Sequence, residues 1–283
     1  MIGKILVAID HKESSQNALV QASILARSEG SRIVLQSVVP SYNGDLRMMG
    51  HTEALEEMRT PYRNALDKAH ATAKVFNLRP KTVFEEGEPG NQILSLAEKE
   101  QVDLIVINLD SRNLAQRIPF GEVTAKIISD SKKDILVIPE SSELKLERIL
   151  LAFDQSDASR IALNRAIELS LTYGSELTIF NAYEIALEGF SYSPGIWNDE
   201  VKKAKKLLYE AEKLAQSRGV RLLNTVMKHG KASQEISEFA KSLDAGLIVL
   251  GCKKGGSIRK MLQGNVVGRV INNRTIPVWI SKH

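Results

Sequence analysis

The sequence has little that would mark a secreted, membrane-bound or metal-binding protein. Cys252 is the single cysteine, so the chain cannot form an intramolecular disulfide or a thiolate cluster for zinc or iron–sulfur. The first apolar run, residues 5–9, is too short for a signal peptide, and no run approaches the ~18 apolar residues of a membrane span. We therefore expect a cytoplasmic protein with no membrane partner.

The sequence also lacks the motifs of familiar catalysts and the charge pattern of a nucleic-acid binder. It contains no Gly-x-Ser-x-Gly, Gly-x4-Gly-Lys-Ser/Thr or His-Glu-x2-His, and neither His11 nor His229 has a second histidine at ligand spacing. The net charge is +4, and the lysine-rich run 202–206 lies on the polar face of an amphipathic segment. We expect no metal site and no nucleic-acid partner, and the sequence gives no reason to propose a standard enzyme.

What the sequence does contain is an internal repeat. Residues 5–10 (ILVAID) and 149–154 (ILLAFD) match at an offset of 144. The offset becomes 143 between the LIV triplets that begin at Leu104 and Leu247. A period of this length indicates whole domains rather than solenoid repeats. We predict two domains, residues 1–143 and 144–283, divided in the polar stretch that follows Pro139.

Each copy alternates short apolar runs with longer amphipathic segments. Continuous Ile, Val and Leu runs are typical of parallel strands covered on both faces, and apolar residues at 3- and 4-residue steps predict the helices between them. The predicted strands are residues 4–9, 32–38, 81–85, 104–108 and 135–138, then 149–153, 176–182, 222–227, 247–250 and 278–280. The expected fold class is therefore α/β, with two doubly wound parallel-sheet domains in tandem.

Glycine and proline mark the ends of several predicted helices. Gly30, Gly174 and Gly219 follow three helical stretches, where a residue that can adopt positive φ is favoured. Pro61 interrupts the segment 53–76, so we expect it to kink that helix or to move its start.

Doubly wound sheets bind ligands at the carboxyl ends of their strands, at the point where the strand order reverses. In each copy, two loops follow strands that are expected to end at this point. One loop begins at Asp10 or Asp154, and the other covers residues 108–121 or 251–264. A strand ending in Ala-x-Asp, with a later strand followed by Gly-x-x-Gly-x9-Gly-Ser/Thr, resembles the universal stress protein family over essentially the whole chain. The resemblance implies Rossmann-like domains of the adenine nucleotide alpha hydrolase-like type and a role in the stress response.

The same resemblance implies a nucleotide site in the second copy. In nucleotide-binding members of the family, the glycine-rich loop and the Ser or Thr after its last glycine hold ATP phosphates, and the first-strand aspartate lies by the nucleotide. Small residues let backbone N–H groups approach an anion, and a helix N-terminus adds partial positive charge. Carried over, the phosphate contacts are Gly251, Lys254, Gly264, Asn265 and Val266, with Asp154 near the ribose and Ala182 near the adenine. Lys254 stands in place of a glycine and Asn265 in place of the hydroxyl residue, so this loop is altered.

The first copy departs further from the family pattern. Asn108 and Ser111 stand where two glycines belong, Asp110 adds a negative charge, and Glu122 takes the hydroxyl position after Gly121. A carboxylate within ~4 Å of a polyphosphate costs on the order of a few kcal/mol at an effective dielectric near 20. Without a bridging cation, we expect no ATP in the first copy.

Several alternatives stay open at this stage. Asp10 and Asp154 can instead cap the helices that follow them, and Cys252 is either a partly buried thiol or a redox sensor. The resemblance implies a non-enzymatic stress-response binding and regulatory module. The alternatives are an ATP-binding switch with slow hydrolysis, with Mg²⁺ held near Asp154, and a carrier of another small molecule.

The last strand of each copy is expected at a sheet edge. An exposed edge at Asp134–Pro139 or Pro277–Ser281 is a ready pairing surface. Because family domains often dimerise through this strand, the resemblance implies that the two copies pair inside one chain. A homodimer of two chains and an unknown protein partner both stay open.

Overall fold

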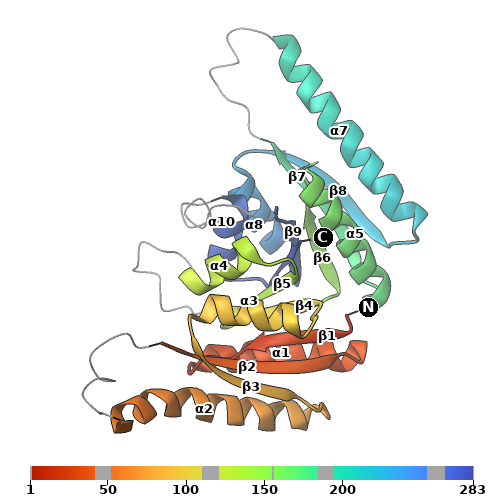
Figure 1. Cartoon of the computed structure of the whole chain (residues 1–283). Coiled ribbons are helices and arrows are strands. Elements are labelled where there is room, and N and C mark those ends of the chain that lie inside the picture. The colour runs from red at the N-terminus through yellow and green to blue at the C-terminus, as the bar shows by residue number, and fades with distance from the viewer. Residues whose placement is uncertain are drawn as a thin grey trace. The chain divides into compact units, whose positions relative to one another are not determined.

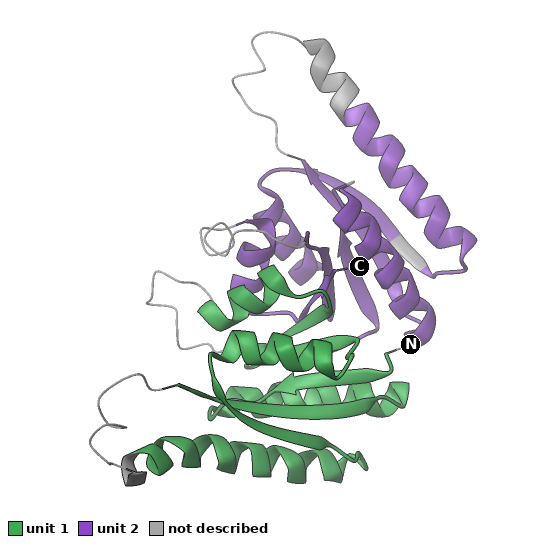
Figure 2. Cartoon of the chain, viewed as in Figure 1, with its two compact units in different colours: residues 1–142 green, residues 143–283 purple. Residues whose placement is uncertain are grey.

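The computed structural model describes residues 2–41, 52–109, 121–154, 156–183, 194–253 and 265–282. The chain divides into two compact units, unit 1 (residues 1–142) and unit 2 (residues 143–283), coloured separately in Figure 2. In each unit strands alternate with helices along the chain (Figure 1). The predicted α/β class is confirmed.

Unit 1 has the topology of a doubly wound domain. Its elements in chain order are β1 (Lys4–Ala8), α1 (Glu13–Glu29), β2 (Arg32–Pro40), α2 (Thr52–Val75), β3 (Lys81–Gly87), α3 (Pro89–Lys99), β4 (Leu104–Leu109), α4 (Glu122–Asp130) and β5 (Asp134–Pro139). The strand order is β3-β2-β1-β4-β5, and neighbouring strands are parallel. Helix α1 contacts α2, and α3 contacts α4, which places one pair on each face of the sheet.

Unit 2 repeats this topology strand for strand. Its elements are β6 (Arg148–Ala152), α5 (Asp157–Tyr173), β7 (Glu176–Tyr183), α7 (Pro194–Ser217), β8 (Leu222–His229), α8 (Ala232–Ser242), β9 (Leu247–Gly251), α10 (Val266–Asn272) and β10 (Val278–Ser281). The strand order is β10-β9-β6-β7-β8, again with parallel neighbours. The two units are therefore two copies of one fold, as the internal repeat predicted.

The strand interiors form the core of each unit. Ile5, Leu6 and Val7 are fully buried in β1, and Phe180 and Trp279 are among the largest fully buried side chains of unit 2. Consecutive residues of one strand point to opposite faces, so uninterrupted burial along β1 requires cover on both faces. This is why the strands read as continuous apolar runs in the sequence.

The helix ends follow the glycine signals. Gly30, Gly174 and Gly219 have φ values of 68°, 67° and 80°, the left-handed conformation that a helix C-terminus favours. Pro61 lies inside α2, which spans Thr52–Val75. The alternative in which Pro61 moves the start of this helix is wrong.

A register irregularity explains why the repeat offset changes. Helices α2 and α7 end alike, with the amides of Leu78 and Val220 bonded to the carbonyls of Ala73 and Ala215, an offset of 142. In β8, Leu177 pairs with Leu222 but Thr178 pairs with Asn224, which leaves one extra residue in the strand. This bulge adds the residue that brings the later strands to an offset of 143.

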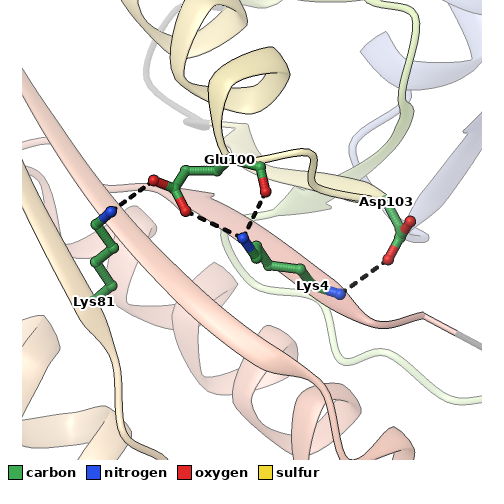
Figure 3. A network of polar contacts seen from close by, with 4 residues as sticks. All are labelled: Lys4, Lys81, Glu100 and Asp103. Atoms are coloured by element: carbon green, nitrogen blue, oxygen red, sulfur yellow. Dashed lines mark hydrogen bonds and ion pairs between the residues drawn. The ribbon is translucent and has the colours of Figure 1, made fainter.

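A polar network joins the amino ends of β1 and β3 to the connection between α3 and β4 (Figure 3). Lys4 Nζ donates to the Glu100 carbonyl at 2.6 Å and pairs with its carboxylate at 3.1 Å, while Lys81 Nζ reaches the other carboxylate oxygen at 2.6 Å. Asp103 accepts from the Lys4 backbone N–H at 3.0 Å. Hydrogen bonds from Lys81 and Lys4 hold the pKa of Glu100 below its ordinary value.

Candidate functional site

The candidate site of unit 2 lies where β6 and β9 end. Connections from β6 and β9 run to opposite sides of the sheet, so the strand order reverses between these two neighbours. Leu151 pairs with Val249, which brings the carboxyl ends of the two strands together. Asp154 follows β6 and Gly251 ends β9, so two of the residues predicted from the sequence come from this switch point.

Asp154 shapes the turn into α5. Its Oδ1 accepts the backbone N–H of Ser156 at 3.1 Å, and Ser156 in turn caps α5 by accepting from the Ser159 N–H at 3.2 Å. The capping role belongs to Ser156, whereas Asp154 closes the turn before it. The Asp154 side chain is exposed, so its second carboxylate oxygen can take a ligand hydroxyl.

The matching turn in unit 1 is built differently. Asp10 Oδ1 accepts from the Lys12 N–H at 3.0 Å, but the cap residue Lys12 makes no side-chain capping bond. The His11 ring lies edge-on to Tyr62 with centroids 4.9 Å apart. Burial, and then the charge of Asp10, raises the pKa of Tyr62. An aromatic pair therefore lies beside the turn in unit 1.

Gly251 is needed for close packing of α5. A Cβ on Gly251 would lie 2.2 Å from the carbonyl carbon and oxygen of Ala158 and 2.6 Å from the Ser159 nitrogen. In unit 1 the corresponding residue is Asn108, whose Nδ2 donates to Ser14 Oγ at 2.8 Å. Unit 1 thus links this strand and helix through side chains, whereas unit 2 brings the helix backbone against the strand.

The predicted phosphate loop is described only at its two ends. Lys254 and Gly264 lie outside the described residues. Asn265 caps α10 by accepting from the Gly268 N–H at 2.7 Å, and Val266, the first helical residue, is 41% exposed. The Asn265 amide oxygen is committed to the helix, which leaves its NH₂ group as a donor.

Asn181 is a site residue that the sequence reasoning missed. It lies in β7 next to the half-buried Ala182 and is 5% exposed. Its Nδ2 donates to the Phe153 carbonyl at 2.7 Å, but its buried Oδ1 has no partner among the described residues. The available signal was a polar side chain near the carboxyl end of the strand, directly after the apolar pair Ile179 and Phe180. In unit 1 this position is Ser37, whose hydroxyl donates to the Tyr62 carbonyl at 3.3 Å.

Other candidates from the sequence do not gather into a site in the described part of the chain. Cys252 is 8% exposed, with its thiol 3.6 Å from the Lys253 carbonyl. His229 lies edge-on to Tyr183 with ring centroids 5.4 Å apart. Over the described ranges, no group of three His, Cys, Asp or Glu side chains is placed to hold a metal ion. Within the same ranges, no helix is both long and apolar enough to cross a membrane.

Comparison with known proteins agrees with the duplicated fold. The family model described as the universal stress protein family matches residues 1–139 and again residues 145–282. Universal stress protein YxiE of Bacillus subtilis (strain 168) is 31% identical over 144 residues, which are 47% of this chain and 97% of the relative. Universal stress protein MJ0531 of Methanocaldococcus jannaschii is 30% identical over 151 residues, 51% of this chain and 87% of the relative.

A solved structure shares the two-copy architecture. The crystal structure of a universal stress protein from Archaeoglobus fulgidus DSM 4304 superimposes with a TM-score of 0.79 at 19% identity, covering 99% of this chain and 96% of that one. At this identity the match supports the fold. The two family-model matches, one for each unit, support the family. The chain therefore belongs to the universal stress protein family and carries two copies of the family's domain.

Proposed function

We propose that the protein is a non-enzymatic binding and regulatory module of the stress response and that unit 2 takes an adenine nucleotide. The observation that carries the nucleotide proposal is the buried Asn181 Oδ1, which has no hydrogen-bond partner among the described residues. A buried acceptor left unpaired costs about 1–3 kcal/mol. A ligand that donates a hydrogen bond, such as an adenine amino group or a ribose hydroxyl, would remove that penalty.

Other residues predicted for the site of unit 2 carry groups that suit the parts of a nucleotide. Ala182 is the next residue on β7 and is half-buried, as an adenine contact requires. The exposed carboxylate of Asp154 can accept from a ribose hydroxyl, and the free NH₂ group of Asn265 can donate to a phosphate oxygen. Lys254 and Gly264 complete the proposed phosphate contacts by resemblance to the family.

Unit 1 has no unpaired acceptor at the position of Asn181. Ser37, which replaces Asn181, has its hydroxyl bonded to a backbone carbonyl. Glu122 begins α4 as an exposed residue after Gly121, so a carboxylate occupies the position of the phosphate-binding hydroxyl. The proposal therefore assigns the nucleotide to unit 2 alone.

Calorimetry with ATP, with and without Mg²⁺, tests the proposal. Asn181→Ser installs the residue of unit 1, and we expect the ATP Kd to rise about 5- to 150-fold, because the loss of one buried bond corresponds to about 1–3 kcal/mol. Ser37→Ala in unit 1 is the matched control and should leave the Kd unchanged. Thermal unfolding identifies a variant that fails to fold. An unchanged Kd in Asn181→Ser, or no binding by the wild type, would refute the proposed site.

Two further assays separate the alternatives. Phosphate release that requires Mg²⁺ and is lost in Asn181→Ser would favour an ATP-driven switch over a non-enzymatic module. Native mass spectrometry of gently purified protein would reveal another small molecule if unit 2 is a carrier.

The proposal extends to how the units associate. Within its own unit, β5 pairs with β4, and β10 pairs with β9, so each lies at an edge. Edge strands offer unpaired N–H and C=O groups to a second strand. In the proposed arrangement, β5 and β10 pair with each other inside one chain, and a homodimer of two chains is a further level of association.

A further inference from the structure

A cavity of about 310 Å³ opens in unit 1, away from the candidate nucleotide site. It lies among the end of α1, the start of β2 and the segment after α2, elements that contact one another (Figure 1). Three exposed arginines line it, namely Arg27, Arg32 and Arg79. None of the three forms an ion pair with another described residue.

Unit 2 has different residues at two of the equivalent positions. Its counterpart of Arg79 is Arg221, since each lies two residues after the left-handed residue, Asn77 or Gly219, that ends the preceding helix. The counterpart of Arg32 is Glu176, and Arg221 pairs with it at 2.8 Å. An ion pair in unit 2 is thus replaced by two arginines in unit 1.

The third arginine strengthens the difference between the units. Arg27 corresponds to the exposed Leu171. Unit 2 therefore has a neutral residue at this position, and its ion pair has no additional positive charge from it. In unit 1, three guanidinium groups border one small cavity, and like charges brought together repel one another. A bound anion removes that repulsion, and the planar fork of arginine matches the geometry of phosphate oxygens.

The remaining lining of the cavity is partly apolar. Ile33 is buried, and Phe76 and Leu78 are half-buried. The volume lies at the lower end of the range for small-molecule pockets. Such a pocket suits a compact ligand that carries phosphate groups on one side and can place an apolar part against these side chains.

We propose that this arginine pocket binds a small phosphate-bearing anion. The site is independent of the nucleotide proposed for unit 2, because every lining residue belongs to unit 1. Neither the resemblance to the family nor the proposed function assigns a ligand to it.

The test uses the full chain and follows amide NMR signals while pyrophosphate or phenyl phosphate is added at about 0.15 M salt, where exposed charges are already screened. We expect the amide signals of Ser31, Ile33 and Leu78 to shift. Tighter binding of pyrophosphate than of phenyl phosphate would identify the ligand as an inorganic phosphate. The reverse order would identify it as an organic phosphate ester. Absence of shifts at these amides with both probes would overturn the proposal.

Variants taken from unit 2 provide the sharper comparison. Arg32→Glu should recreate the Glu–Arg pair with Arg79 and weaken binding of the better probe about 10- to 100-fold, since bonds to charged groups are the strong ones. Arg27→Leu, also the residue of unit 2, should weaken it in the same direction. Lys99→Glu, an equal charge change at an exposed residue of α3, is the control and should leave the Kd unchanged. If Lys99→Glu weakens binding as much as Arg32→Glu does, net charge alone explains the weaker binding, and the proposed binding pocket is refuted.

Discussion

Replacing Gly251 with alanine would place a methyl group against the backbone of α5. The new Cβ would lie 2.2 Å from the Ala158 carbonyl carbon and oxygen, whereas unstrained contacts are about 3.5 Å, so the first turn of α5 must move by on the order of 1 Å. Overpacking of this kind typically costs about 1–3 kcal/mol. Because the contacted atoms are backbone, an added Ala158→Gly change should not restore stability.

Urea unfolding measures this cost within unit 2. Both tryptophans of the chain, Trp197 and Trp279, lie in residues 143–283, so their fluorescence reports on that unit. We expect Gly251→Ala to lower the free energy of unfolding of unit 2 by about 1–3 kcal/mol with an unchanged slope in urea.

Gly121→Ala is the matched control, followed by circular dichroism. A Cβ on Gly121 would meet no atom of the described residues within 4 Å, and the backbone φ of −54° suits alanine. Its free energy of unfolding should stay within about 0.5 kcal/mol of the wild type. A Gly251→Ala variant that unfolds at the wild-type urea concentration would refute the packing role of Gly251.

Two further predictions concern a charge network and a strand edge. Because the folded-state pKa of Glu100 is lowered, its pairs with Lys81 and Lys4 stabilise the fold above the ordinary value of 4.5, and this contribution disappears as pH falls through the lowered pKa. Glu100→Gln should therefore be less stable than the wild type at pH 7, and urea titrations should show the difference shrinking below pH 4.5; a constant difference would contradict this reasoning. If β5 and β10 pair, alternate amides of both strands that would otherwise face an open edge should resist hydrogen exchange in the full chain. Rapid exchange of every second amide in these strands would exclude the pairing.

Much of the fold could be predicted from the sequence because the signals are local. Continuous apolar runs mark strands buried on both faces, and the ten predicted strands agree with the structure to within two residues at each end. The three glycines after helices have the expected left-handed conformation. Pro61 shows the limit of such signals, since tertiary contacts keep α2 helical on both sides of it.

The candidate site was harder to predict because its chemistry depends on contacts through space. Gly251 fits a phosphate-loop motif in the sequence, yet the backbone of α5 already requires a glycine there. The unpaired oxygen of Asn181 depends on which atoms surround the end of β7. Likewise, Arg79 lies far from Arg27 and Arg32 in the sequence, and only folding brings them to one cavity.

The bulge in β8 bears on aggregation. Within their own units β3 and β8 are the strands at the edge opposite β5 and β10, and long regular edges invite cross-β stacking of partly unfolded chains. The extra residue in β8 interrupts such stacking, and β3 follows Pro80 and carries the charged Lys81 and Glu85. An engineered chain that deletes Leu223 would straighten β8 and gain a surface that seeds insoluble fibres.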